Sequence, residues 1–87
     1  MIKIVHLAIT GPTTASLAFS DGSAATWSAA DLIARDTVMT RPLADPGYFA
    51  RAFIEAGAIA WPNGLELSAD SLHRRLGEAG ALIRSAA

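Results

Sequence analysis

The stretch "ASLAFSDGSAATWS", residues 15–28, decides the fold class of this chain. Apolar and small polar residues alternate up to Phe19, which is the period of a strand with one buried face. Asp21-Gly22 follows, and this pair is a strong hairpin signal because glycine accepts the positive φ of a tight turn. The return strand is expected over residues 24–27. The stretch therefore predicts an antiparallel β-hairpin.

A short helix is predicted directly after this hairpin. Ser28 is followed three positions later by Asp31. This spacing is typical of a helix start, where the serine oxygen accepts a backbone N–H and the carboxylate lies at the positive end of the helix. We expect the helix over about residues 29–35. The next segment, 36–47, contains two prolines and is interpreted as a loop that ends in one helical turn, with Asp45 as its cap.

Further strands are predicted on both sides of this region. Residues 2–9 are apolar at both alternating sets of positions, which favours a strand covered on both faces and central in a sheet. Residues 51–55 and 58–61 are interpreted as two strands joined at a turn. Residues 65–67 form a short extended piece. The chain thus offers enough strands for a sheet of about four or five.

The last helix is predicted to open at residues 68–70 and to present one apolar face. That face carries Leu72, Leu76, Ala79 and Ile83, at helical spacing. Gly77 and Gly80 each disfavour helix by about 1 kcal/mol relative to alanine, so we expect the helix to weaken there. Residues 1–87 are thus expected to form one α+β domain. We expect this domain to contain a small antiparallel sheet, a short helix after the first hairpin, and a C-terminal helix packed on one face of the sheet.

Composition excludes several classes of protein. The 87 residues carry a net charge of -1, and only 17% of them are charged, whereas 52% are hydrophobic. Nucleic-acid binding draws on phosphate neutralisation, so this balance disfavours it. Cysteine is absent, which excludes disulfides and thiolate sites and suits a cytoplasmic protein. No apolar run approaches the ~18 residues of a membrane span, so we expect no membrane segment.

Four landmarks, taken in order, resemble the bacterial domain of unknown function 2442 family. They are Phe19-Ser20-Asp21-Gly22, Pro42-Leu43-Ala44-Asp45-Pro46 with Phe49, Trp61-Pro62-Asn63-Gly64 and Asp70-Ser71-Leu72. The resemblance runs from about residue 2 to residue 76. It implies a small α+β domain of unassigned biochemistry, often encoded beside another small protein, and hence an interaction or antitoxin-like role.

Departures from the family pattern bear on chemistry. Ser28 stands where the family usually has aspartate, and both residues are good helix caps, which favours capping over acid chemistry. Ala69 stands where proline is usual, and His73 where tyrosine is frequent. Some members resemble transcription regulators because a helix-turn-helix follows the domain. That segment would lie beyond Ala87, so the regulator reading is kept only as the alternative function.

The Trp61-Pro62-Asn63-Gly64 turn allows two interpretations. Proline fixes φ at the second turn position, and asparagine and glycine tolerate the conformations that follow. The Trp61 ring would then anchor the corner in the core, with its indole N–H bonded to a partner. The alternative is a binding lip in which Trp61 and Asn63 contact a ligand or peptide.

No catalytic, cofactor or metal site is predicted. His6 lies in an apolar strand and His73 on the last helix, and no glycine pattern of a nucleophile elbow surrounds a serine. Two distant histidines with scattered carboxylates have no metal-ligand spacing. The aspartates fall at turns and helix starts, where carboxylates act as caps. We therefore expect a protein that is not an enzyme; an unrecognised enzyme is a further alternative.

Two features favour an interaction role. Phe53 and Ile54 are neighbours in a strand and must point to opposite faces, so at most one of them enters the core from a single covered face. His73, Arg74 and Arg75 could form a basic face with Arg84 that docks an acidic partner. Together with the low charge and the alanine-rich tail, these residues predict a non-enzymatic module that binds another protein or a second copy of itself.

Overall fold

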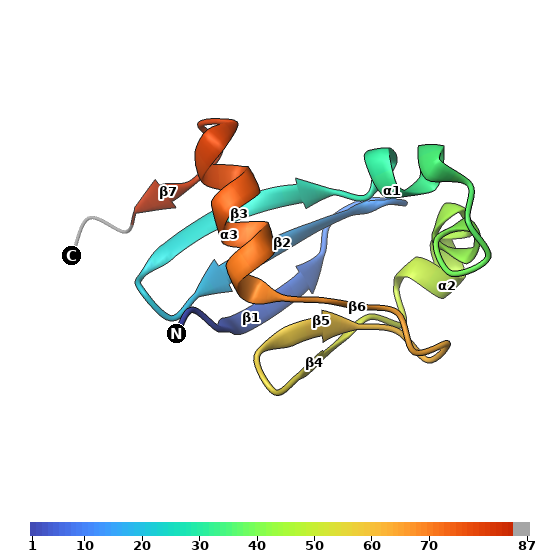
Figure 1. Cartoon of the computed structure of the whole chain (residues 1–87), viewed down its shortest axis with the longest axis horizontal. Helices are drawn as coiled ribbons and strands as arrows, with labels where there is room; N and C mark the ends of the chain where they lie inside the picture. Colours follow the sequence, from blue (N-terminus) through green and yellow to red (C-terminus); the bar gives the residue numbers. More distant parts are fainter. Residues whose placement is uncertain (85–87) are drawn as a thin grey trace.

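The predicted hairpin is present in the computed structural model of the chain, which describes residues 1–84 (Figure 1). Strands β2 (Thr14–Phe19) and β3 (Ser23–Ser28) pair in antiparallel fashion. Gly22 has a φ of +88°, as the tight turn requires. The end of the alanine-rich tail, residues 85–87, lies outside the described residues.

The hairpin belongs to a four-stranded sheet with the order β1-β2-β3-β7. β1 (Ile4–Ile9) lies at the edge of this sheet, and Val5 is 60% exposed. The expectation of a central strand covered on both faces was therefore wrong. β1 has a paired neighbour on one side only, and the register shifts between Ile4 and His6, which leaves Val5 without a place in the ladder.

The C-terminal helix packs on one face of this sheet, as predicted. α3 (Ala69–Glu78) begins at Ser68, whose hydroxyl accepts a hydrogen bond from the Ser71 N–H. The prediction that its apolar face extends to Ile83 was wrong, because the helix ends at Glu78 and β7 (Ile83–Arg84) pairs with β3. The chain reverses at Gly80, which has a φ of +70°.

A second sheet, with the order β4-β5-β6, lies beside the start of β1 (Figure 1). It consists of β4 (Phe53–Glu55), β5 (Ala58–Ala60) and β6 (Glu66–Leu67). The expected strands are present, but they divide between two sheets rather than forming one. The link is local: the Ile4 N–H donates to the Gly57 carbonyl at 2.8 Å. A Cβ on Gly57 would lie 2.8 Å from the Lys3 side chain, so only glycine allows this approach.

Three short helical segments connect the two sheets. They are α1 (Ala30–Arg35), the 3-10 helix η1 (Arg41–Ala44) and α2 (Pro46–Phe49). Ser28 accepts from the Ala30 N–H at 3.2 Å, so it supports the start of α1 from the position before the N-cap. Asp45 accepts from the Gly47 N–H and caps α2, as predicted.

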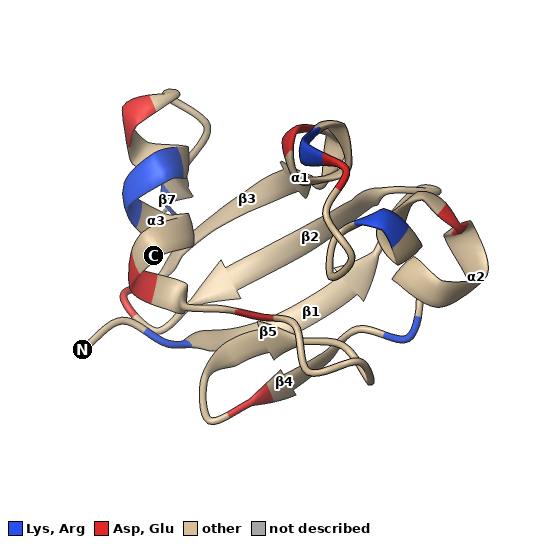
Figure 2. Ribbon diagram, turned by 45° about the vertical axis from the view of Figure 1, so that its right-hand side comes forward, with Lys and Arg blue, Asp and Glu red and all other residues tan. Residues whose placement is uncertain are grey.

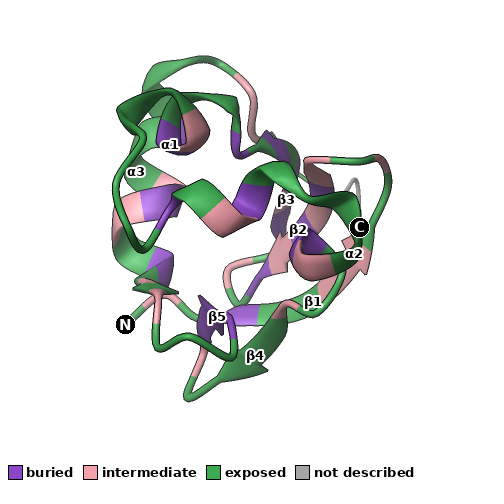
Figure 3. Ribbon diagram, turned by 90° about the vertical axis from the view of Figure 1, so that its right-hand side faces the viewer, coloured by how far each residue is buried: buried purple, intermediate pink, exposed green. Residues whose placement is uncertain are grey.

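Three aromatic rings join these parts in one core. Trp27 of β3 stacks on Phe49 with ring centroids 6.2 Å apart, and Trp61 lies 5.9 Å from Phe49 and 6.2 Å from Trp27. Buried residues occupy the inner faces of β2, β3 and β5, whereas β4 is exposed (Figure 3). The α+β class is confirmed, and the aromatic trio connects β3 with α2 and with the turn that follows β5.

Candidate functional site

A groove of about 530 Å³ lies between α1 and α3, over the end of β3 and beside β6. Its volume is within the range of about 300–1,000 Å³ that ligand sites in proteins occupy. The apolar part is formed by side chains from four elements: Trp27, Leu32, Leu67, Leu72 and Leu76. The groove therefore has an apolar floor that four separate segments of the chain hold in place.

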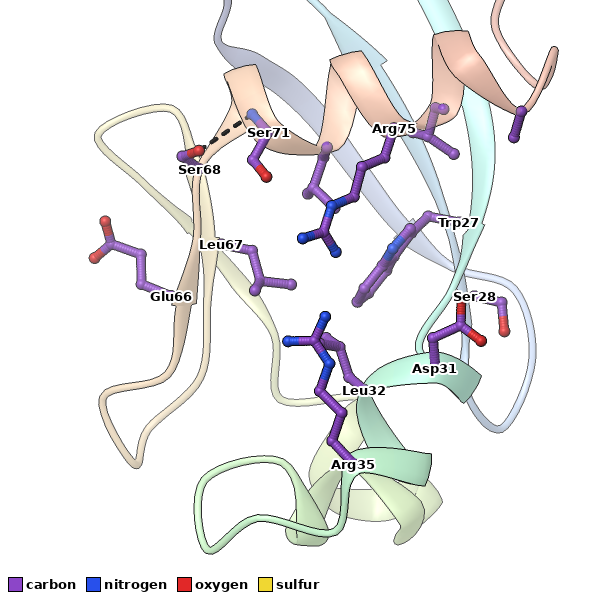
Figure 4. A pocket seen from close by; sticks show the side chains of 13 residues that line it. Trp27, Ser28, Asp31, Leu32, Arg35, Glu66, Leu67, Ser68, Ser71 and Arg75 are labelled. Atoms are coloured by element: carbon purple, nitrogen blue, oxygen red, sulfur yellow. Dashed lines mark hydrogen bonds between the residues drawn. The ribbon is translucent and has the colours of Figure 1, made fainter.

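Two arginines approach this floor from opposite helices. Arg35, at the end of α1, and Arg75, on α3, point their guanidinium groups toward one another across the groove (Figure 4). Glu66 points away from the centre, and Asp31 lies on the Ser28 side of Trp27 (Figure 4). Within residues 1–84 neither arginine has a carboxylate within 4.0 Å, since the ion pairs there involve other residues.

The floor of the groove is continuous with the core because Trp27 belongs to the aromatic trio. Trp27 is 8% exposed, and its ring stacks on Phe49, which does not line the groove. The Trp27 indole N–H donates no hydrogen bond in the described part of the chain, whereas that of Trp61 donates to the Phe49 carbonyl at 3.1 Å. A ligand would thus meet an apolar surface with two cations beside it.

A second polar cluster lies around His73, in the middle of α3, outside the groove. Asp21 accepts from the Ser23 hydroxyl and backbone N–H, and its second oxygen is 2.9 Å from His73 Nε2. Arg84 Nη2 lies 3.4 Å from the same oxygen. The Ser23 hydrogen bonds, followed by those of His73, hold the pKa of the Asp21 carboxyl well below its usual range, although partial burial opposes the shift. This cluster ties α3 and β7 to the first hairpin.

The cluster has the residue types of a hydrolase but not their arrangement. A nucleophilic serine has to contact the imidazole that removes its proton. Here the Ser23 hydroxyl donates to Asp21, and its residue is only 1% exposed. His6 lies opposite Ala18 on the outward face of the sheet, whereas His73 contacts Phe19 of the core. The fold therefore keeps the two histidines apart.

The predicted basic face is divided by the structure. His73 is directed to Asp21, Arg75 lines the groove, and Arg74 is exposed without lining it. Arg84 joins His73 at Asp21. Lys and Arg residues lie on separate elements around the molecule rather than in one stripe (Figure 2). Of the predicted cluster, only Arg75 contributes to the groove.

Of the two interpretations of the Trp61 turn, core anchor and binding lip, the structure agrees with the core anchor. Trp61 is 1% exposed, so its ring is not available as a binding lip. Asn63 Oδ1 accepts from the Leu65 N–H, and Nδ2 donates to the Met39 carbonyl at 3.1 Å. Gly64 has a φ of +91°, as the turn requires. The side-chain amide of Asn63 is thus engaged within the fold at both ends.

Phe53 and Ile54 remain partly exposed, at 41% and 39%. Neither side chain therefore enters the core. β4 is a three-residue edge strand, and Ile59 of the neighbouring β5 takes the core position with 0% exposure. Phe53 stays a candidate contact residue on this basis.

Among residues 1–84, no three histidines and carboxylates gather as a metal-binding group. None of the helices in this part of the chain has the length and apolar character needed to cross a membrane. Comparisons with protein-family models, curated proteins and solved structures found no match.

The sequence analysis did not identify Arg35 or Trp27 as site residues. Both line the groove together with Arg75, and Arg35 faces Arg75 across it. Asp31 and Arg35 are four residues apart, so the sequence does indicate that they share one face of α1. The approach of α1 to α3 is not visible in local patterns, because it depends on how both helices pack in one core.

Proposed function

We propose that this protein is a non-enzymatic interaction module that binds another protein through the groove between α1 and α3. The observation that carries the proposal is the pair Arg35 and Arg75, two cations over an apolar floor that have no ion-pair partner among residues 1–84. Apolar floors with a few placed charges are the usual composition of sites that recognise a partner segment.

The Asp21 cluster supports a structural rather than a catalytic use of His73. One carboxylate oxygen of Asp21 accepts from the Ser23 hydroxyl, and the other is hydrogen-bonded to His73 Nε2. The Ser23 hydroxyl therefore donates to the carboxylate and not to the imidazole. The resemblance to the domain of unknown function 2442 family adds a class of partner, a small protein encoded beside this one, with an antitoxin-like relationship as one form of it.

The test is affinity purification from the producing cells at two salt concentrations, with two matched variants. Ser71→Trp places a large ring in the groove, while the backbone N–H of residue 71 still donates to the Ser68 cap of α3. Ser16→Trp makes the same chemical change on the outward face of β2, opposite Thr26. Melting temperatures of both variants establish that they fold.

We expect one small protein to be recovered with the wild type and with Ser16→Trp at both salt concentrations, and to be lost with Ser71→Trp. Equal recovery with Ser71→Trp would show that the groove is not the contact surface. Nucleic acid that is recovered only at low salt would instead support the alternative of a transcription regulator.

A second copy of the chain is the alternative partner. The exposure of Phe53 and Ile54 on β4 favours it, because exposed apolar side chains are a surface that a second copy can cover. Sedimentation velocity tests this alternative directly. A dimer in the wild type that dissociates in Ile54→Glu, and persists in Ser71→Trp, would place the contact at β4 rather than in the groove.

A further inference from the structure

We propose that Arg35 and Arg75 form a carboxylate clamp, which binds an aspartate or glutamate side chain of the partner between the two guanidinium groups. The apolar residues next to that acid in the partner would then lie on the apolar floor of the groove. This inference rests on the proposed function and specifies the chemistry of the partner segment. It concerns a site at which two guanidinium groups converge without a counter-ion among residues 1–84.

The convergence of like charges is the first reason. Two guanidinium groups that face one another repel, and a neighbouring acid would relieve this repulsion. Asp31 and Glu66 line the same groove but are directed elsewhere (Figure 4). A carboxylate that enters between the arginines would neutralise both and could accept paired hydrogen bonds from each planar fork.

The floor decides between an acidic peptide and a nucleic acid. Proteins that bind single-stranded nucleic acid stack its bases on solvent-exposed faces of aromatic side chains. Trp27 is only 8% exposed, and one of its faces is covered by Phe49. Leucine side chains form most of the remaining floor, which suits aliphatic side chains beside the carboxylate. The occupant is therefore an acidic segment with apolar residues next to the acid.

The neighbouring residue Arg74 provides an internal control. It lies one position before Arg75 on the same helix, is exposed and does not line the groove. General attraction to an acidic peptide would depend on Arg74 as much as on Arg75. A clamp would depend on Arg75 and Arg35 only.

The experiment is an NMR titration of the ¹⁵N-labelled full chain with a short capped peptide that carries one glutamate between leucines. A second peptide has glutamine in its place. The chain has two tryptophans, so the two indole N–H signals report separately on the groove, through Trp27, and on the buried turn, through Trp61.

We expect the glutamate peptide to shift the Trp27 indole signal and leave that of Trp61 in place, and the glutamine peptide to bind about tenfold or more weakly. Arg35→Gln and Arg75→Gln should each weaken binding of the glutamate peptide by about the same factor, whereas Arg74→Gln should leave its binding unchanged. Arg75→Lys should bind more weakly than the wild type, because lysine keeps the charge but loses the fork.

Three results would overturn the clamp. They are equal binding of both peptides, an Arg74→Gln effect as large as that of Arg75→Gln, and no Trp27 shift at millimolar glutamate peptide. A Trp27 shift with single-stranded DNA and none with the peptide would assign the groove to nucleic acid. Loss of partner capture by Ser71→Trp is a separate readout, so the interaction proposal can stand when the clamp fails.

Discussion

The Trp61 turn and the groove both combine tryptophan with polar side chains, yet they differ in how those polar groups are satisfied. At the turn, the Trp61 indole and both ends of the Asn63 amide are bonded within the fold. In the groove, Arg35 and Arg75 have no ion-pair partner among residues 1–84. Polar groups that the fold satisfies stabilise it, whereas unpaired groups on an apolar floor are available to another molecule.

The largest effect is expected at the turn. Trp61→Ala removes a ring that is 1% exposed and should lower the free energy of unfolding by about 3–5 kcal/mol, as measured by urea denaturation. Trp61→Phe should fall between this variant and the wild type, because it keeps an aromatic ring but loses the donor to the Phe49 carbonyl. An unchanged denaturation midpoint in Trp61→Ala would contradict the core role of the ring.

A smaller loss is expected from Asn63. Asn63→Ala removes the acceptor for Leu65 and the donor to Met39, which at about 0.5–1.5 kcal/mol each gives a loss of about 1–3 kcal/mol. Asn63→Asp keeps the acceptor and loses the donor, so it should be intermediate. If both variants were as stable as the wild type, the amide would not be structural and its role as a contact residue would return.

The Asp21 cluster makes a pH-dependent contribution. Because the pKa of Asp21 is lower in the folded chain than its ordinary value of 3.8, its contribution to stability is fully present above that value. It is lost as the pH falls from about 4 toward the lower pKa of the folded state. Urea denaturation of the wild type and Asp21→Asn should thus show a stability difference that shrinks on acidification.

Ser23→Ala separates the causes of that shift. It removes the hydroxyl that donates to Asp21 and leaves the backbone N–H of the same residue. The loss of stability on acidification should therefore be smaller than in the wild type. An identical pH dependence in the wild type and Asp21→Asn would contradict the assignment of this behaviour to Asp21.

The sequence predicted much of the fold because its local signals are strong. Asp21-Gly22, Asp45-Pro46 and Ser68 place a turn and two helix starts correctly. It failed where burial depends on distant elements. The apolar pattern of residues 2–9 does not show that β1 is an edge strand, and the helical spacing of Ile83 does not show that β7 pairs with β3.

The candidate site was less predictable for the same reason. The sequence indicates Arg75 only as part of a basic run on one helix, but His73 of that run faces Asp21 and Arg74 lies outside the groove. The counterpart of Arg75, Arg35, is forty residues earlier in the sequence and lines the same groove because α1 and α3 bury Leu32, Leu72 and Leu76 in one core. Packing of this kind is a property of the whole chain, and no local period encodes it.

The most direct test of the difference between the two regions is the stability of the double variant Arg35→Gln/Arg75→Gln, measured by urea denaturation at low salt. If these arginines serve a partner rather than the fold, the variant should be as stable as the wild type or slightly more stable, because two facing like charges are removed. A loss of about 1 kcal/mol or more, as expected for the Asn63 turn, would show that the arginines are structural.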